Sequence, residues 1–166
     1  MTWLYKTDNN NTARFTLGEY NNALGKTLIC LGINPSTATP NALDPTLKKV
    51  KNIATYHNYK NWVMINVYPQ RATNPKYLHI NCNTQLHSEN LDEIKDLLNA
   101  FKNCDILFAY GDLINIRPYL KNCLIDILSI ISSVGFAGQK MCIKRTKKGN
   151  PVHPLYQKFD SKLLPY

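Results

Sequence analysis

The sequence has no long hydrophobic run and no sign of a secretion signal. None of its apolar stretches reaches the roughly 18 residues that a membrane-spanning helix needs. Its first eleven residues also lack the basic-then-apolar order of a signal peptide. We therefore expect a cytoplasmic protein that has no membrane partner.

Paired cysteines are also missing. The five cysteines are odd in number, widely spaced and nowhere arranged as Cys-x-x-Cys. This spacing argues against disulfides, a zinc site and an iron–sulfur cluster. Three of the cysteines lie in apolar runs, which favours buried free thiols. The sequence therefore predicts neither a metal nor another cofactor.

Acidic residues are scarce as well. The 11 Asp and Glu face 20 Lys and Arg, and the formal net charge is +9. Residues 140–166 hold seven basic residues and one acidic residue, which is +6 of that total. Such a cluster either forms a solvated surface that keeps the protein soluble, or it follows the phosphates of a nucleic acid by releasing counterions.

Four apolar runs predict β-strands. They cover residues 27–33, 62–67, 105–110 and 140–144. The first three are nearly continuous rather than alternating, which is typical of strands that are covered on both faces in a parallel sheet. Residues 13–20 are expected to add an edge strand or a flap.

Three helical patterns separate these strands. They cover residues 45–57, 88–101 and 118–134. Asp44 before Pro45 predicts an N-cap followed by proline in the first turn. Ser88 with Glu89 after it predicts the start of the second helix, and Gly135 closes the third.

The alternation of strands and helices predicts an α/β protein. We expect a three-layer sandwich in which a central, mainly parallel four-stranded sheet is flanked by helices and joined by right-handed crossovers. The sequence has no repeat and no linker, and a chain near ~150 residues can bury about 70% of its unfolded surface. Residues 1–166 are therefore expected to form a single domain.

Unusual residues follow each predicted strand. The first strand ends in Asn34-Pro35-Ser36, the second in Asn66 and the third in Tyr110-Gly111-Asp112, and the fourth leads to His153-Pro154-Leu155. Ligands of open parallel sheets bind beyond the carboxyl ends of the strands, so these groups are predicted to share one edge. Each has a structural alternative: the asparagines satisfy loose backbone groups, and the histidine is a surface residue without a role.

These motifs resemble those of a known superfamily. "GINPS", "INVYPQRATNP" and "HPLY" are similar to the uracil-DNA glycosylase superfamily, in which Gly-x-Asp/Asn-Pro follows the first strand, an asparagine ends the second and a His-Pro motif lies after the last. More narrowly, the order of "NPSTA", "DPT", "RATNP" and "HPLY" over residues 28–156 resembles a family of small proteins from bacterial mobile elements and phages.

The resemblance implies a DNA glycosylase of base excision repair. Such an enzyme flips uracil, or a related deaminated base, out of DNA and hydrolyses its N-glycosidic bond to leave an abasic site. Asn34 would position the attacking water, and His153 would donate a hydrogen bond to O2 of the leaving base. Asn66 would accept the N3 proton of uracil and donate to its O4, a pattern that cytosine reverses.

The resemblance also implies further contacts. The substrate-binding set would be completed by Gly32, Ile33, Pro35, Ser36 and Tyr68. DNA would be bound by Arg71, Lys144, Arg145, Lys147, Lys148, Pro154, Leu155 and Tyr156. The cations would hold phosphates, and the apolar side chains after the histidine would fill the gap that the flipped base leaves.

Two departures from the superfamily pattern concern the base. Residues 35–55 contain no aromatic residue to stack on uracil, which leaves Tyr56 or Tyr68 as the nearest substitutes. Ser36 stands where the branch most selective for uracil has the tyrosine that excludes thymine.

We expect a monomer whose partners are single- or double-stranded uracil-containing DNA and a protein inhibitor of uracil-DNA glycosylases.

Two other functions stay open. One is a non-catalytic binder or sensor of uracil-containing or single-stranded DNA. The other is an enzyme that acts on a free nucleotide or another small ligand, although such a ligand does not require the basic C-terminal segment.

Overall fold

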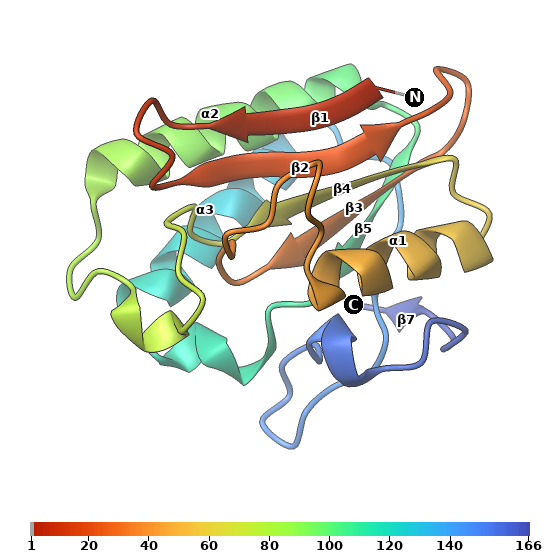
Figure 1. The fold of residues 1–166 in the computed structure, drawn as a ribbon. Helices are drawn as coiled ribbons and strands as arrows, with labels where there is room; N and C mark the ends of the chain where they lie inside the picture. Colours follow the sequence, from red (N-terminus) through yellow and green to blue (C-terminus); the bar gives the residue numbers. More distant parts are fainter. Residues whose placement is uncertain (1) are drawn as a thin grey trace.

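The computed structural model describes residues 2–166, and its centre is one seven-stranded sheet (Figure 1). The order across the sheet is β1-β2-β4-β3-β5-β6-β7. In chain order the strands are β1 (Thr2–Thr7), β2 (Arg14–Tyr20), β3 (Thr27–Gly32), β4 (Asn61–Asn66), β5 (Cys104–Phe108), β6 (Lys140–Cys142) and β7 (Leu164–Pro165). The helices are α1 (Pro45–Tyr56), α2 (Thr84–Ala100) and α3 (Tyr119–Ser133), with short 3₁₀ helices η1 (Pro75–Tyr77), η2 (Gly111–Asn115) and η3 (Pro154–Tyr156).

The α/β class is confirmed, but the prediction of a mainly parallel, four-stranded sheet is wrong, because the sheet has seven strands and mixes parallel with antiparallel pairs. The four predicted strands form the parallel centre in the order β4-β3-β5-β6. β1 and β2 add an antiparallel pair next to β4, and β7 pairs antiparallel with β6. β1 is largely exposed and β7 is two residues long, so neither has the apolar run by which a strand is recognised. β2 is an interior strand because β1 covers its outer edge.

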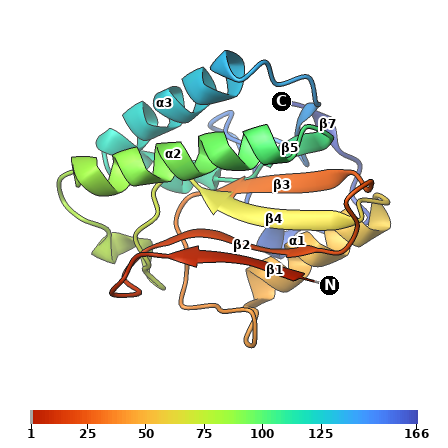
Figure 2. The same cartoon turned by 90° about the horizontal axis from the view of Figure 1, so that it is seen from above.

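Helices cover both faces of the sheet (Figure 2). Alternate residues of β3 belong to two separate apolar clusters: Leu28 and Cys30 pack with residues of α1, whereas Ile29 and Leu31 pack with residues of α2 and α3. Burial on both faces explains why the run is continuously apolar.

The helix starts show one success and one correction. Asp44 caps α1 as predicted, and its Oδ1 accepts a hydrogen bond from Leu47 N at 2.8 Å. The second helix begins at Thr84 rather than near Ser88, because Asn83 is the residue whose side chain accepts from Leu86 N (3.0 Å). Ser88 lies inside the helix.

Three further observations concern membrane spans, cysteines and metal ligands. Within residues 2–166, no helix combines the length and the apolar character needed to cross a bilayer. All five cysteines are free thiols, four of them buried and Cys82 half-buried. No three His, Cys, Asp or Glu side chains of this part of the chain come together as metal ligands.

Candidate functional site

A cavity of about 370 Å³ lies at the carboxyl ends of β3 and β4. This volume falls within the range of small-molecule sites. Three segments far apart in the sequence contribute to its wall: the loop after β3, the end of β4 and the segment around η3. Of the residues predicted for the site, the cavity wall includes Ile33, Asn34, Ser36, Asn66, His153, Leu155 and Tyr156.

Asn66 ends β4 and lies in the cavity wall with its side chain unpaired. The residue is 1% exposed, and neither Nδ2 nor Oδ1 has a hydrogen-bond partner. Asn90 Nδ2 donates to the Asn66 carbonyl at 3.0 Å and holds its backbone. A Cβ at Gly32 would clash with Met64 and lie 3.0 Å from Asn66 Oδ1, so the glycine leaves room for this amide. A buried unpaired polar group costs roughly 1–3 kcal/mol, which a matching ligand would recover.

Asn34 begins the loop after β3 and is half-buried. Its Nδ2 donates to the carbonyls of Ala72 (2.8 Å) and Pro35 (3.1 Å), and Ala72 N donates back to Pro35 O (2.9 Å). The amide nitrogen therefore satisfies backbone carbonyls, which is the structural role that the sequence left open for this asparagine. Because both of its hydrogens are used, Oδ1 is the part of the amide left to accept a hydrogen bond. Pro35 itself is buried and supplies this junction rather than the cavity wall.

His153 is half-buried and precedes η3. Its Nδ1 accepts a hydrogen bond from Leu155 N at 3.3 Å, so a neutral ring carries its proton on Nε2. Burial lowers the pKa of His153, and the nearby Asp44 carboxylate opposes this only in part. The side chain is thus a neutral Nε2–H donor at neutral pH. Gly111 lies beside His153, and its φ of +64°, rather than the space there, favours glycine, because a Cβ would make only an ordinary contact with His153 Cβ at 3.7 Å.

Asp44 also lines the cavity, but its carboxylate is engaged. Oδ2 accepts from Ser36 Oγ at 2.5 Å, while Oδ1 caps α1. The carboxylate therefore ties the loop after β3 to the start of α1. The sequence identified Asp44 only as a helix cap.

The predicted phosphate-binding lysines lie on a separate hairpin. Lys144, Arg145, Lys147 and Lys148 are exposed, and Thr146 N donates to Asn150 O at 2.7 Å across the turn. Asp112, after β5, anchors this hairpin: its Oδ1 accepts from Asn150 Nδ2 and Thr146 Oγ1, both at 2.7 Å. These two hydrogen bonds lower the pKa of Asp112. We call residues 144–152 the basic hairpin.

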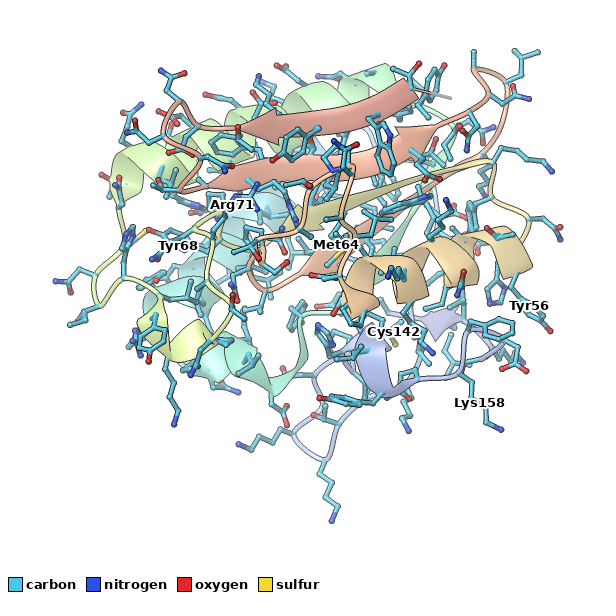
Figure 3. The ribbon with its side chains drawn as sticks, in the orientation of Figure 1. Tyr56, Met64, Tyr68, Arg71, Cys142 and Lys158 are labelled. Carbon is cyan, nitrogen blue, oxygen red and sulfur yellow. The ribbon has the colours of Figure 1, made fainter. Side chains whose placement is uncertain are left out.

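Three predicted contacts lie elsewhere. Tyr68 is 0% exposed in the α2/α3 core, where its OH pairs with His79 Nδ1 at 2.7 Å, so the expectation that it contacts the ligand is corrected. Figure 3 shows Met64 close to the first turn of α1 and Tyr68 away from it. Arg71 is half-buried and donates to Ser36 O (2.6 Å) and Ala38 O (3.2 Å), so its guanidinium holds a loop. Pro154 is buried and shapes η3.

The cavity also contains a cation that the sequence analysis missed. Arg14, the first residue of β2, is 2% exposed and lines the cavity. No motif marked it, and the only signal was a charged residue in front of a buried run. Within residues 2–166, Tyr156 is the one Phe, Tyr or Trp of the wall, and it lies at the rim with 85% of its surface exposed.

The chain belongs to a protein family known by the description "Protein of unknown function (DUF1643)". The family pattern matches residues 14–155, which include β2 and the segment around His153. No curated protein and no solved structure matches the chain.

Proposed function

We propose that this member of the family is a DNA glycosylase that hydrolyses the N-glycosidic bond of uracil, or of a related deaminated base, in DNA. The observation that carries the proposal is the Asn66 amide, buried with both polar atoms unpaired in a cavity shared with Asn34 and His153. Uracil presents an N3–H donor beside an O4 acceptor, which pairs with Oδ1 and Nδ2 of one asparagine.

The same amide would discriminate against cytosine. Cytosine presents an acceptor at N3 and a donor at N4. The acceptor Oδ1 of Asn66 would therefore face another acceptor, and the donor Nδ2 would face another donor. Each buried mismatch would cost roughly 1–3 kcal/mol. Asn90 holds the backbone of Asn66, and the missing side chain at Gly32 leaves room for the Asn66 amide.

Bond cleavage requires a site for negative charge and a placed water. The C1′–N1 bond breaks with its electron pair on the base, and His153 Nε2–H would donate to O2 as charge grows there. Asn34 Oδ1 would accept a hydrogen bond from the water that adds to C1′. An amide is not a base, so this step would depend on positioning, and the water proton finally balances the anionic base.

DNA would approach over the basic hairpin and η3. Leu155 and Tyr156 line the rim of the cavity, where apolar side chains can occupy the space that a flipped base leaves in the duplex. The four exposed cations of the basic hairpin would bind the flanking phosphates. Arg71 and Pro154 would contribute indirectly, by fixing the loop after β3 and the turn of η3.

A strand-cleavage assay tests the proposal. Oligonucleotides that carry one uracil, single- or double-stranded, are incubated with the protein and treated with alkali, which cuts abasic sites. The wild type should produce cleavage that Asn34→Ala and His153→Ala lose, whereas Lys121→Ala, an exposed cation of α3, should leave it unchanged. Folded wild-type protein that releases no uracil, or variants that cleave as well as wild type, would overturn the proposal.

One observation favours a second candidate, a non-catalytic binder of uracil-containing DNA. The Asn34 amide nitrogen joins two loops, which is a sufficient structural reason for this asparagine. The same oligonucleotides separate the two candidates: uracil-dependent binding without cleavage supports the binder.

A further inference from the structure

A β-bulge turns Arg14 into the cavity. Lys6 pairs with Thr16 and Thr7 with Arg14, so Phe15 has no partner of its own on β1. A bulge shifts the alternation of side chains along a strand. Arg14 therefore lines the cavity on the α1 side, where Leu17 also packs, whereas Phe15 lines a groove beside α2.

The Arg14 guanidinium is a buried cation with free hydrogen-bonding capacity. Its Nη1 donates to Ala38 O at 3.0 Å, and its buried Nε has no partner. No carboxylate of residues 2–166 forms an ion pair with it. Burial and the neighbouring Arg71 lower the pKa of Arg14 to about 10, although the Asp44 carboxylate and Tyr5 oppose this in part, and Arg14 is still charged at neutral pH. A buried charge is costly unless a counter-charge meets it.

Arg14 lies at the Asn66 end of the cavity. The backbone N–H of Arg14 donates to Pro69 O at 2.9 Å, just beyond the end of β4, and β2 is the neighbour of β4 in the sheet. His153 lies beside Gly111, which follows β5 on the other side of β3. A pyrimidine that places O2 at His153 and N3 and O4 at Asn66 would therefore turn its O4 side toward Arg14.

We propose that Arg14 is a further catalytic residue, which holds the negative charge that reaches O4 of the departing base. This inference rests on the proposed function. When the C1′–N1 bond breaks, its electron pair enters the ring of the base and is shared by O2 and O4. His153 would donate a hydrogen bond to O2, and the Arg14 guanidinium would donate to O4. The ligand class of the cavity is accordingly a planar imide that carries a negative charge.

Binding of two small imides tests the assignment without DNA. Barbiturate is a ring anion at neutral pH with its charge shared by carbonyl oxygens, and uracil offers a similar imide edge without charge. Titration calorimetry should show that the wild type prefers barbiturate. Arg14→Gln should reduce this preference by about tenfold to a hundredfold, the effect of one charge-assisted hydrogen bond. Arg14→Lys should keep part of it.

Lys121→Gln is the control, because this exposed cation of α3 lies outside the cavity wall and its substitution removes the same charge. It should keep the barbiturate preference. The proposal is overturned by a preference that survives in Arg14→Gln, by its loss in Lys121→Gln, or by folded wild type that does not bind barbiturate. If Arg14→Gln does not fold, Arg14→Lys is the test: a reduced preference for barbiturate supports the proposal, and an unchanged preference overturns it.

The outcomes separate this inference from the proposed function. Barbiturate binding that depends on Arg14, without release of uracil from DNA, would refute the glycosylase and leave the anion site standing. Uracil release that is equally fast in Arg14→Gln would refute the role of Arg14 and leave the glycosylase standing.

Discussion

The two ends of β4 carry the same residue in opposite states. Asn61 and Asn66 are each 1% exposed. Asn61 makes five hydrogen bonds: Oδ1 accepts from Asn21 N and Asn22 N, and Nδ2 donates to Asn22 O, Gly25 O and Thr27 Oγ1. The Asn66 amide makes none. Two asparagines that are equally buried therefore differ in role: the Asn61 side chain closes a turn, whereas the Asn66 side chain is free to hydrogen-bond a ligand.

The largest effect on stability is expected from Asn61→Ala. The substitution removes five hydrogen bonds and leaves backbone groups of the 21–25 turn without partners. We expect a loss of about 3 kcal/mol or more in the free energy of unfolding, measured by urea denaturation. Asn66→Ala is the matched control and should cost about 1 kcal/mol or less, because it removes an amide that nothing satisfies. Similar losses at both positions would contradict the contrast between the two ends.

The largest effect on activity is expected from His153→Ala. Loss of one donor to a developing charge slows such reactions by about 10²–10³-fold. Single-turnover cleavage of a uracil-containing oligonucleotide measures the rate. His153→Gln should recover part of it if a neutral donor is what the step requires. A histidine that acts as a cation would show no recovery.

Asn66→Ala should weaken recognition without weakening the fold. The variant loses two hydrogen bonds to the base, so uracil-dependent binding should fall by about tenfold to a hundredfold. Competition between uracil- and cytosine-containing oligonucleotides measures the change. Selectivity for uracil that survives in Asn66→Ala would move base recognition to another part of the wall.

A smaller effect is expected from pH. The folded-state pKa of His153 is lowered by burial, so the unfolded chain binds the proton more tightly. The stability that neutral His153 contributes is therefore present above its ordinary pKa of 6.5 and is lost as pH falls from there toward the folded pKa. Urea denaturation between pH 7 and pH 5 should show a steeper loss for the wild type than for His153→Gln. Parallel pH profiles would contradict a buried neutral histidine.

The smallest effect is expected on the basic hairpin. Lys147→Ala and Lys148→Ala should each reduce the slope of log affinity against log salt by about 0.9 for duplex DNA. Neither should change the binding of barbiturate or the selectivity for uracil, because both side chains are exposed and outside the cavity wall. Altered selectivity in these variants would show that the hairpin contacts the base.

Much of the framework follows from local patterns along the chain. The sequence predicts β3, β4 and β5 from their continuous apolar runs, because burial on two faces leaves such a run. It also predicts the Asp44 cap of α1, because helix capping depends on a few adjacent residues. The same rules place Asn34, Asn66 and the segment leading to His153 at one edge of the sheet. β1 and the start of α2 were missed, since an exposed strand has no apolar run and Asn83 and Ser88 are both acceptable caps.

The sequence by itself determined the parallel centre of the sheet and the edge at which its polar residues gather. Only the tertiary structure decided which of them share a cavity. Tyr68 enters the α2/α3 core two residues after Asn66, and a bulge at Phe15 directs Arg14 inward. Partners 34–40 residues away along the chain satisfy the Asn61 side chain, whereas the amide of Asn66 meets none. Hydrogen-bond satisfaction depends on contacts between distant segments, and no local pattern records it.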